Sequence, residues 1–270
     1  RAADELGLDR SVPVLGGCCD VTAAALGTGE VEDGALHISV ATSAWIGGFF
    51  PSRRLNVPSS YATITSALNF RPLLIASQES AGSALAWAVR ITGRETDEEE
   101  LAGAFEKIGY PASDDPFFAP WLAGERVPVD DDRLRGAFHG LSLHHDANSL
   151  RRAALEGVAL NLRWSYDKVS SEGSVVKDGP IALGGGVSSN KVFAQVVADA
   201  LNRPVRVGQS RHAGVLGTAT LAAKSMGWAE DAAMMAARLS QKESVFYEPD
   251  RIRSEVLAER AQKLARIRKH

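Results

Sequence analysis

The sequence is poor in cysteine, and this absence excludes one class of protein at the outset. Its only cysteines, Cys18 and Cys19, are adjacent in a chain of 270 residues. Neighbouring cysteines seldom form an unstrained disulfide, and two sulfurs without nearby histidines are too few for a zinc site. A disulfide-stabilised secreted domain is therefore excluded, and we expect both cysteines to be small buried side chains in a reducing cytoplasm.

Long hydrophobic runs and an excess of one charge are also lacking. No apolar run approaches the roughly 20 residues of a membrane-spanning helix. The formal net charge of −3 gives no basic field that would attract nucleic acid or anionic lipid. The adjacent histidines His144 and His145 point in different directions in any regular structure, which argues against a shared metal. We therefore expect a cytoplasmic protein with no nucleic-acid or membrane partner and no metal-ligating residues.

What remains is ordinary globular composition, with 45% hydrophobic and 23% charged residues, in segments that alternate between strand and helix patterns. Strands are expected over residues 12–16, 36–41, 73–77, 180–186 and 204–207, with residues 36–50 forming a hairpin with a very short turn. Helices are expected over residues 79–93, 96–109, 149–170, 190–202 and 214–227. This alternation predicts an α/β fold.

Two glycine-containing turns are candidates for binding chemistry. Asp20 lies between such a turn and a small-residue helix, where an acid usually caps the helix. The segment LGGGVSSNKVF, residues 183–193, predicts a strand, a glycine turn and a helix capped by Ser189 or Asn190. Glycines let the backbone approach a flat or anionic ligand, and a helix start offers free amides. The segment lacks the third glycine of a dinucleotide fingerprint and the following acid, so a dinucleotide-dependent enzyme remains only a minor alternative.

The hairpin tip and a long central loop are further candidates. Turn amides and the hydroxyl of Thr42 can hold an anion, although Thr42 can equally bond its own backbone. Residues 111–148 predict an ordered loop region with short strands. Its charged residues have the pattern of a solvated cluster, although a loop of this length usually has a function. These residues are Glu125, Arg126, Asp130 and Arg135.

Five separated segments in this order resemble the FGGY family of carbohydrate kinases, and within it the xylulokinases. They are the glycine turn ending at Asp20, the Thr42-Ser43 hairpin, GERVPVDDDRLRGAFHGL, LRRAALEGV and GGGVSSNKVFAQVVADAL. The resemblance runs from about residue 12 to residue 223. It implies an actin-like (ribonuclease H-like) ATPase domain, with a mixed sheet flanked by helices.

The same resemblance implies a division of the chain. Residues 1–34 would be the tail of an N-terminal sugar-binding domain that is not in these 270 residues, and residues 35–270 the C-terminal nucleotide-binding domain. The partners implied are a small sugar, the N-terminal half of the same protein and a second copy in a homodimer. We therefore expect this chain alone to be inactive as a kinase.

The resemblance also implies a reaction and its residues. ATP with Mg²⁺ would phosphorylate a hydroxyl of D-xylulose or a related ketose or polyol. Asp20 matches the catalytic base of the family, and Thr42 with Ser43 matches the hairpin that contacts the ATP phosphates. Gly82 matches a glycine beside the nucleotide. The turn that binds adenosine is matched by Gly185, Gly186 and Asn190.

Two departures from the family pattern support an alternative function. Ala41 and Ala44 stand where the family hairpin has glycine, and Cys18 and Cys19 precede Asp20 in a turn that is usually glycine-rich. Each alanine adds a methyl group where phosphate should approach and disfavours a positive φ. The alternative is a nucleotide-binding domain that has lost catalysis.

Overall fold

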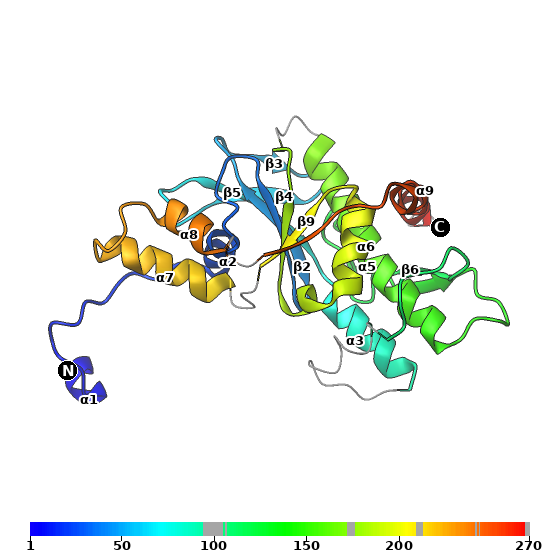
Figure 1. The fold of residues 1–270 in the computed structure, drawn as a ribbon, viewed down its shortest axis with the longest axis horizontal. Coiled ribbons are helices and arrows are strands. Elements are labelled where there is room, and N and C mark those ends of the chain that lie inside the picture. The colour runs from blue at the N-terminus through cyan, green and yellow to red at the C-terminus, as the bar shows by residue number, and fades with distance from the viewer. Residues whose placement is uncertain are drawn as a thin grey trace.

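The computed structural model describes residues 1–93, 105, 107–171, 176–208, 213–240, 242 and 244–267. Helices and strands alternate along most of this chain, as Figure 1 shows. The helix expected over residues 96–109 lies mostly outside the described residues.

A mixed sheet forms the centre of the fold. Its strands are β1 (Leu36–Val40), β2 (Ala44–Phe49), β3 (Leu55–Asn56), β4 (Tyr61–Thr65), β5 (Pro72–Gln78), β8 (Ile181–Gly184), β9 (Val205–Val207) and β10 (Val245–Tyr247). They form an eight-stranded sheet in the order β10-β9-β8-β1-β2-β5-β4-β3. The hairpin and the strands expected from residue 36 onward are confirmed.

Strands β1, β5, β8 and β9 run in the same direction. β8 pairs in parallel with both β1 and β9, whereas β2 is antiparallel to both β1 and β5. The carboxyl ends of these strands, at Val40, Gln78, Gly184 and Val207, therefore lie at one end of the sheet. The crevice outside the carboxyl ends of parallel strands is the usual place for a ligand.

Helices cover both faces of the sheet (Figure 1). One face carries α2 (Asp20–Thr28), α7 (Ala213–Ser225) and α8 (Ala232–Ser240), and the other carries α3 (Gly82–Ile91), α5 (Ala147–Ser171), α6 (Lys191–Leu201) and α9 (Arg251–Ile267). The main apolar core lies beneath α5 and α6, where Ile38, Val158 and Val196 are fully buried. Each such side chain contributes roughly 1.5–3 kcal/mol by burial. The expected mixed sheet flanked by helices is confirmed.

Helices α2 and α7 pack unusually closely, because glycines lie where they meet. A Cβ atom at Gly217 would lie 1.9 Å from the carbonyl oxygen of Ala23, and one at Gly27 would lie 1.7 Å from that of Ala213. Any side chain at these positions would push the helices apart. The small residues of both sequences therefore serve close helix packing.

Residues 1–19 form an arm that projects from the body (Figure 1). The arm contains the short helix α1 (Ala2–Leu6), and residues 13–19 have no regular structure. The strand expected over residues 12–16 is therefore wrong: no strand of the described residues pairs with it, and Val14 is 96% exposed. Cys18 is half-buried and Cys19 is exposed, so the expectation that both are buried is also wrong, although neither forms a disulfide.

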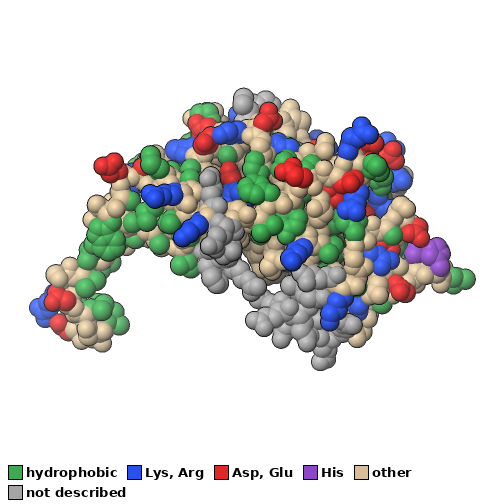
Figure 2. Space-filling model, viewed as in Figure 1, with side chains coloured by type: hydrophobic (Ala, Val, Ile, Leu, Met, Phe, Trp, Pro, Cys, Tyr) green, Lys and Arg blue, Asp and Glu red, His purple; other side chains and the backbone are tan. Residues whose placement is uncertain are grey.

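The surface carries no dominant charge on the face shown in Figure 2. Acidic and basic side chains are interspersed there, and apolar side chains extend along the arm. Among the helices of the described residues, none is long and apolar enough to cross a membrane.

The central loop region holds a second, small sheet. Strands β6 (Phe117–Ala119) and β7 (Ala137–His139) pair in antiparallel register. The rest of residues 111–146 is mostly irregular, and β6 packs against α5. The expected ordered loop with short strands is confirmed.

Candidate active site

The hairpin tip lies at the carboxyl end of β1. Val40 pairs with Ala44, and the amide of Ala41 donates to the carbonyl oxygen of Ser43 at 2.8 Å, which closes a short turn. Thr42 and Ser43 are exposed. Within the described residues, neither hydroxyl has a protein hydrogen-bond partner. The tip therefore presents free hydroxyl groups to a ligand.

The start of α3 is bonded directly to this tip. The amide of Gly82 donates to the carbonyl oxygen of Ala41 at 2.9 Å. The amides of Ala81 and Ser83 donate to the carbonyl oxygen of Thr42 at 3.2 and 3.0 Å. These bonds satisfy amides that a helix start leaves free. Gly82 and Thr42, predicted from separate motifs, are thus held together.

The glycine turn after β8 reaches the same place. Gly185 has a φ of 94°, and a Cβ atom there would lie 2.1 Å from the carbonyl oxygen of Val40. Only glycine allows both this conformation and this close approach. We call the turns at residues 41–43, 79–82 and 185–186 the turn cluster. The structure brings all three together at one end of the sheet.

Gly186 and Asn190 differ in what they can offer a ligand. Gly186 is exposed, and nothing lies within 4 Å of the position of a Cβ atom there. It opens the short 3-10 helix η1 (Gly186–Ser189). Asn190 is fully buried, and its side-chain oxygen accepts from the amide of Phe193 at 2.8 Å. The expected cap of α6 is thus Asn190, while its contact with adenosine stays a prediction.

Asp20 begins α2 on the face that carries α7 and α8. Its side chain is exposed, and Oδ1 accepts from the amide of Val21 at 2.8 Å. The N-cap residue of α2 is Cys19, which makes no side-chain cap hydrogen bond, so the cap that an acid usually forms at such a turn is not made by Asp20. As a carboxylate in the first turn, Asp20 is stabilised by the helix dipole. Within the described residues, no hydrogen bond or ion pair joins Asp20 to the turn cluster. Its role as a base stays a prediction.

The backbone at Ala41 and Ala44 does not adopt the positive φ that would favour glycine. Neither alanine is among the residues with positive φ in the described chain. Ala41 is exposed at the tip, and Ala44 is buried as the first residue of β2. The backbone of this hairpin therefore accommodates both alanines without strain.

Glu125 is buried, which corrects its assignment to a solvated loop cluster. It is 2% exposed, whereas Arg126, Asp130 and Arg135 are exposed as expected. Burial raises the pKa of Glu125 to about 7, although hydrogen bonds from Asn161 and two backbone amides oppose the shift. Its side-chain partner Asn161 lies on α5, so the sequence of the loop alone carries no signal of this contact.

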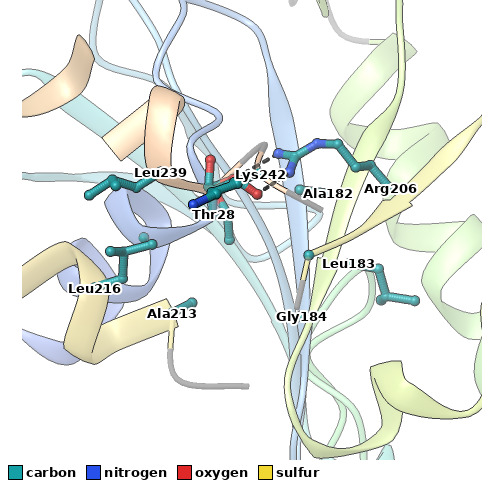
Figure 3. A pocket seen from close by; sticks show the side chains of 12 residues that line it. Thr28, Ala182, Leu183, Gly184, Arg206, Ala213, Leu216, Leu239 and Lys242 are labelled. Atoms are coloured by element: carbon teal, nitrogen blue, oxygen red, sulfur yellow. Dashed lines mark hydrogen bonds between the residues drawn. The ribbon is translucent and has the colours of Figure 1, made fainter. Parts of the chain in front are cut away.

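A cavity of about 310 Å³ lies beside the turn cluster, between α2, the carboxyl ends of β8 and β9, α7 and α8 (Figure 3). Of the predicted site residues none lines it, although Gly184 does. Its buried cation, Arg206, already donates to Glu30 at 2.6 Å and to the carbonyl oxygen of Thr28 at 2.7 Å. Arg206 therefore ties the end of α2 to β9.

Comparison with known proteins defines first the fold and then the family. The crystal structure of a xyloylose kinase from Brucella ovis matches with a TM-score of 0.86 at 27% identity, over 98% of this chain and 54% of that chain. The fold is thus the actin-like ATPase fold of the sugar kinases. Residues 37–226 match the FGGY family of carbohydrate kinases, C-terminal domain. The chain belongs to the FGGY family of carbohydrate kinases.

The curated relatives include both xylulose kinases and gluconokinases. The xylulose kinase of Escherichia coli K12 is 33% identical over 192 residues, covering 70% of this chain and 38% of that protein. That of Lactococcus lactis is 30% identical over 203 residues, covering 74% and 39%. A Bacillus subtilis gluconokinase is 26% identical over 239 residues, covering 83% and 45%. The chain spans about two fifths of the length of these xylulose kinases.

Proposed function

We propose that this chain is the ATP-binding half of a sugar kinase, which transfers a phosphoryl group from ATP to a hydroxyl of D-xylulose or a related ketose or polyol. The observation that carries the proposal is the turn cluster. Three motifs far apart in the sequence place Thr42, Gly82 and Gly185 at one end of the sheet. Family membership supports the sugar as acceptor class.

The residues at the turn cluster fit a nucleotide. The exposed hydroxyls of Thr42 and Ser43 can donate to phosphate oxygens, and the open space at Gly186 admits a flat group against the backbone. Mg²⁺ would enter with the phosphates of ATP and neutralise charge on their oxygens.

In the proposed reaction, Asp20 acts as the general base. As the sugar hydroxyl oxygen forms its bond to the γ-phosphorus, the bond from that phosphorus to the β–γ bridging oxygen breaks and ADP leaves. The hydroxyl proton passes to the Asp20 carboxylate. Phosphoryl transfer has a loose transition state, so positioning and charge neutralisation dominate, and a base of ordinary strength suffices.

Nucleotide binding tests the first half of the proposal. We expect this chain to bind ADP with Mg²⁺ in a calorimetric titration, and the variant Gly186→Val to bind it at least about tenfold more weakly because the new side chain fills the open space. The unfolding midpoint of the variant should be unchanged, since no atom lies within 4 Å of the new Cβ. Equal affinities for both proteins would contradict the proposed site.

Catalysis tests the second half. In the complete protein, Asp20→Asn should lower kcat for D-xylulose phosphorylation by a factor of roughly 10²–10⁴ and leave ADP affinity unchanged. A domain that has lost catalysis would show no turnover before or after the substitution. This chain alone should not turn over D-xylulose with ATP and Mg²⁺, and robust turnover would overturn that expectation.

A further inference from the structure

We propose that Glu125 is a positioning residue for the turn cluster: its carboxylate holds the backbone amide of Glu79 and so fixes the turn that places Gly82 against the Thr42 tip. The inference rests on the proposed function for its meaning, because the turn cluster is there assigned to the nucleotide. Glu125 itself lies behind the cluster, buried within the protein.

The direction of the Glu125 carboxylate is set by neutral donors. Oε2 accepts from the side-chain amide of Asn161 at 2.5 Å, and Oε1 accepts from the backbone amides of Glu79 and Arg126 at 3.0 and 2.9 Å. Asn161 cannot reverse its amide, because its oxygen accepts from the indole N–H of Trp121 at 3.1 Å. Its NH₂ group must therefore face Glu125.

The held amide begins the segment that reaches the tip. Glu79 directly follows the last residue of β5 and precedes the amides of Ala81, Gly82 and Ser83, which donate to the carbonyl oxygens of the hairpin tip. The side chain of Arg126 also pairs with the carboxylate of Glu79. Displacement of the Glu79 amide would thus move the residues that contact Thr42.

The loop that carries Glu125 is itself anchored on α5. The amide of Val127 donates to the carbonyl oxygen of Ser77 at 3.2 Å. The hydroxyl of Ser165, on α5, donates to the carbonyl oxygen of Val127 at 3.1 Å. Gln78 donates to the same hydroxyl at 2.9 Å. The loop therefore joins the carboxyl end of β5 to the longest helix of the described chain.

Only a carboxylate satisfies all these donors. An ionised carboxyl group has acceptor oxygens only, so the Asn161 NH₂ and both backbone amides find partners. In Glu125→Gln, an amide NH₂ would face either the Asn161 NH₂ or the backbone N–H groups, and two donors would oppose each other. An apolar residue would leave the amide of the half-buried Glu79 without this acceptor.

Two measurements on this chain at pH 8 test the inference. The variant Glu125→Gln should reduce hydrogen-exchange protection of the amides at residues 79–83 at least about tenfold, and weaken ADP–Mg²⁺ binding about fivefold or more. Glu156→Gln is the matched control, since Glu156 is equally buried but pairs with Arg260 on α9. The control should change both quantities less than about twofold. Glu125→Asp, which keeps the charge but shortens the side chain, provides a second variant if Glu125→Gln does not fold.

The outcomes separate this inference from the proposed function. In one outcome, Glu125→Gln increases hydrogen exchange selectively at residues 79–83, but the unmodified chain does not bind ADP. This result would refute the nucleotide assignment and support the Glu125 contact. Normal ADP binding in Glu125→Gln and Glu125→Asp, or equal losses in Glu156→Gln, would overturn the positioning role.

Discussion

Glu125 and Glu156 are both buried, and burial raises the pKa of each to about 7, but different partners hold them. Neutral N–H groups from Asn161 and the backbone surround Glu125. A guanidinium group, that of Arg260, pairs with Glu156. Neutral donors fix the direction of a carboxylate, so Glu125 can define the position of a backbone amide. An opposite charge fastens two helices, here α5 and α9, together.

The largest expected effect comes from removing the charged partner. Arg260→Met leaves Glu156 buried without a counter-charge and should lower the free energy of unfolding by about 3–5 kcal/mol at pH 8. The loss should shrink at pH 5, where Glu156 takes up a proton. Urea denaturation at both pH values measures this. Arg266→Met, an exposed site on the same helix, should change stability by less than about 0.5 kcal/mol. An equal loss at both pH values would contradict the charge argument.

Removing the neutral partner should have a somewhat smaller effect. Asn161→Leu preserves volume but leaves the Trp121 indole N–H and one Glu125 oxygen without their partner. We expect a loss of about 2–4 kcal/mol by chemical denaturation, since each unsatisfied buried group costs about 1–3 kcal/mol. Asn148→Ala, whose side chain accepts from Arg151 near the start of the same helix, should cost less than about 1 kcal/mol. Similar losses at both positions would remove the distinction.

The pH dependence of stability should reveal both glutamates together. Native Glu125 and Glu156 hold protons that the unfolded chain releases above about pH 4.5, so the free energy of unfolding should fall as pH rises from about 4.5 to about 7. The fall should be about 1–3 kcal/mol for each group. In the double variant with glutamine at both positions, most of this fall should disappear. A fall of unchanged size would show that other groups cause it.

The smallest expected effect concerns a buried group with no partner of either kind. Among the described residues, neither ring nitrogen of His37 has a hydrogen-bond partner, and burial lowers its pKa to about 3. His37→Leu should therefore raise the free energy of unfolding at pH 7 by about 1 kcal/mol. It should also abolish a loss of stability as pH falls below about 6.5, where unfolded His37 takes up a proton. A destabilised variant would show that edge contact with Trp45 outweighs the unpaired nitrogens.

Local sequence patterns predicted elements that bury their own apolar faces. The alternation over residues 36–41 predicted β1 correctly. In the structure this strand has a neighbouring strand on each side, β8 and β2. Residues 12–16 have a similar apolar pattern, but Val14 is exposed because no strand of the described residues pairs with it. A sequence pattern indicates which residues favour burial, but it does not show whether a neighbouring strand is present to pair with them.

The candidate site likewise contains residues that could be predicted from sequence motifs and a residue that could not. The family resemblance implied that Thr42, Gly82 and Gly185 contact one nucleotide, and the structure brings the backbones around them together at one end of the sheet. The burial of Glu125 could not be predicted, because it depends on Asn161, which lies 36 residues further along the chain. Spacing within one loop cannot report such a contact.

The close packing of α2 against α7 has a consequence for Asp20. Gly217 lets the helices approach until a methyl group would no longer fit between them. Asp20 is the first residue of α2, so a shift of α2 away from α7 would also move its carboxylate. Replacing Gly217 by alanine would act as a spacer, displacing the acid without touching it.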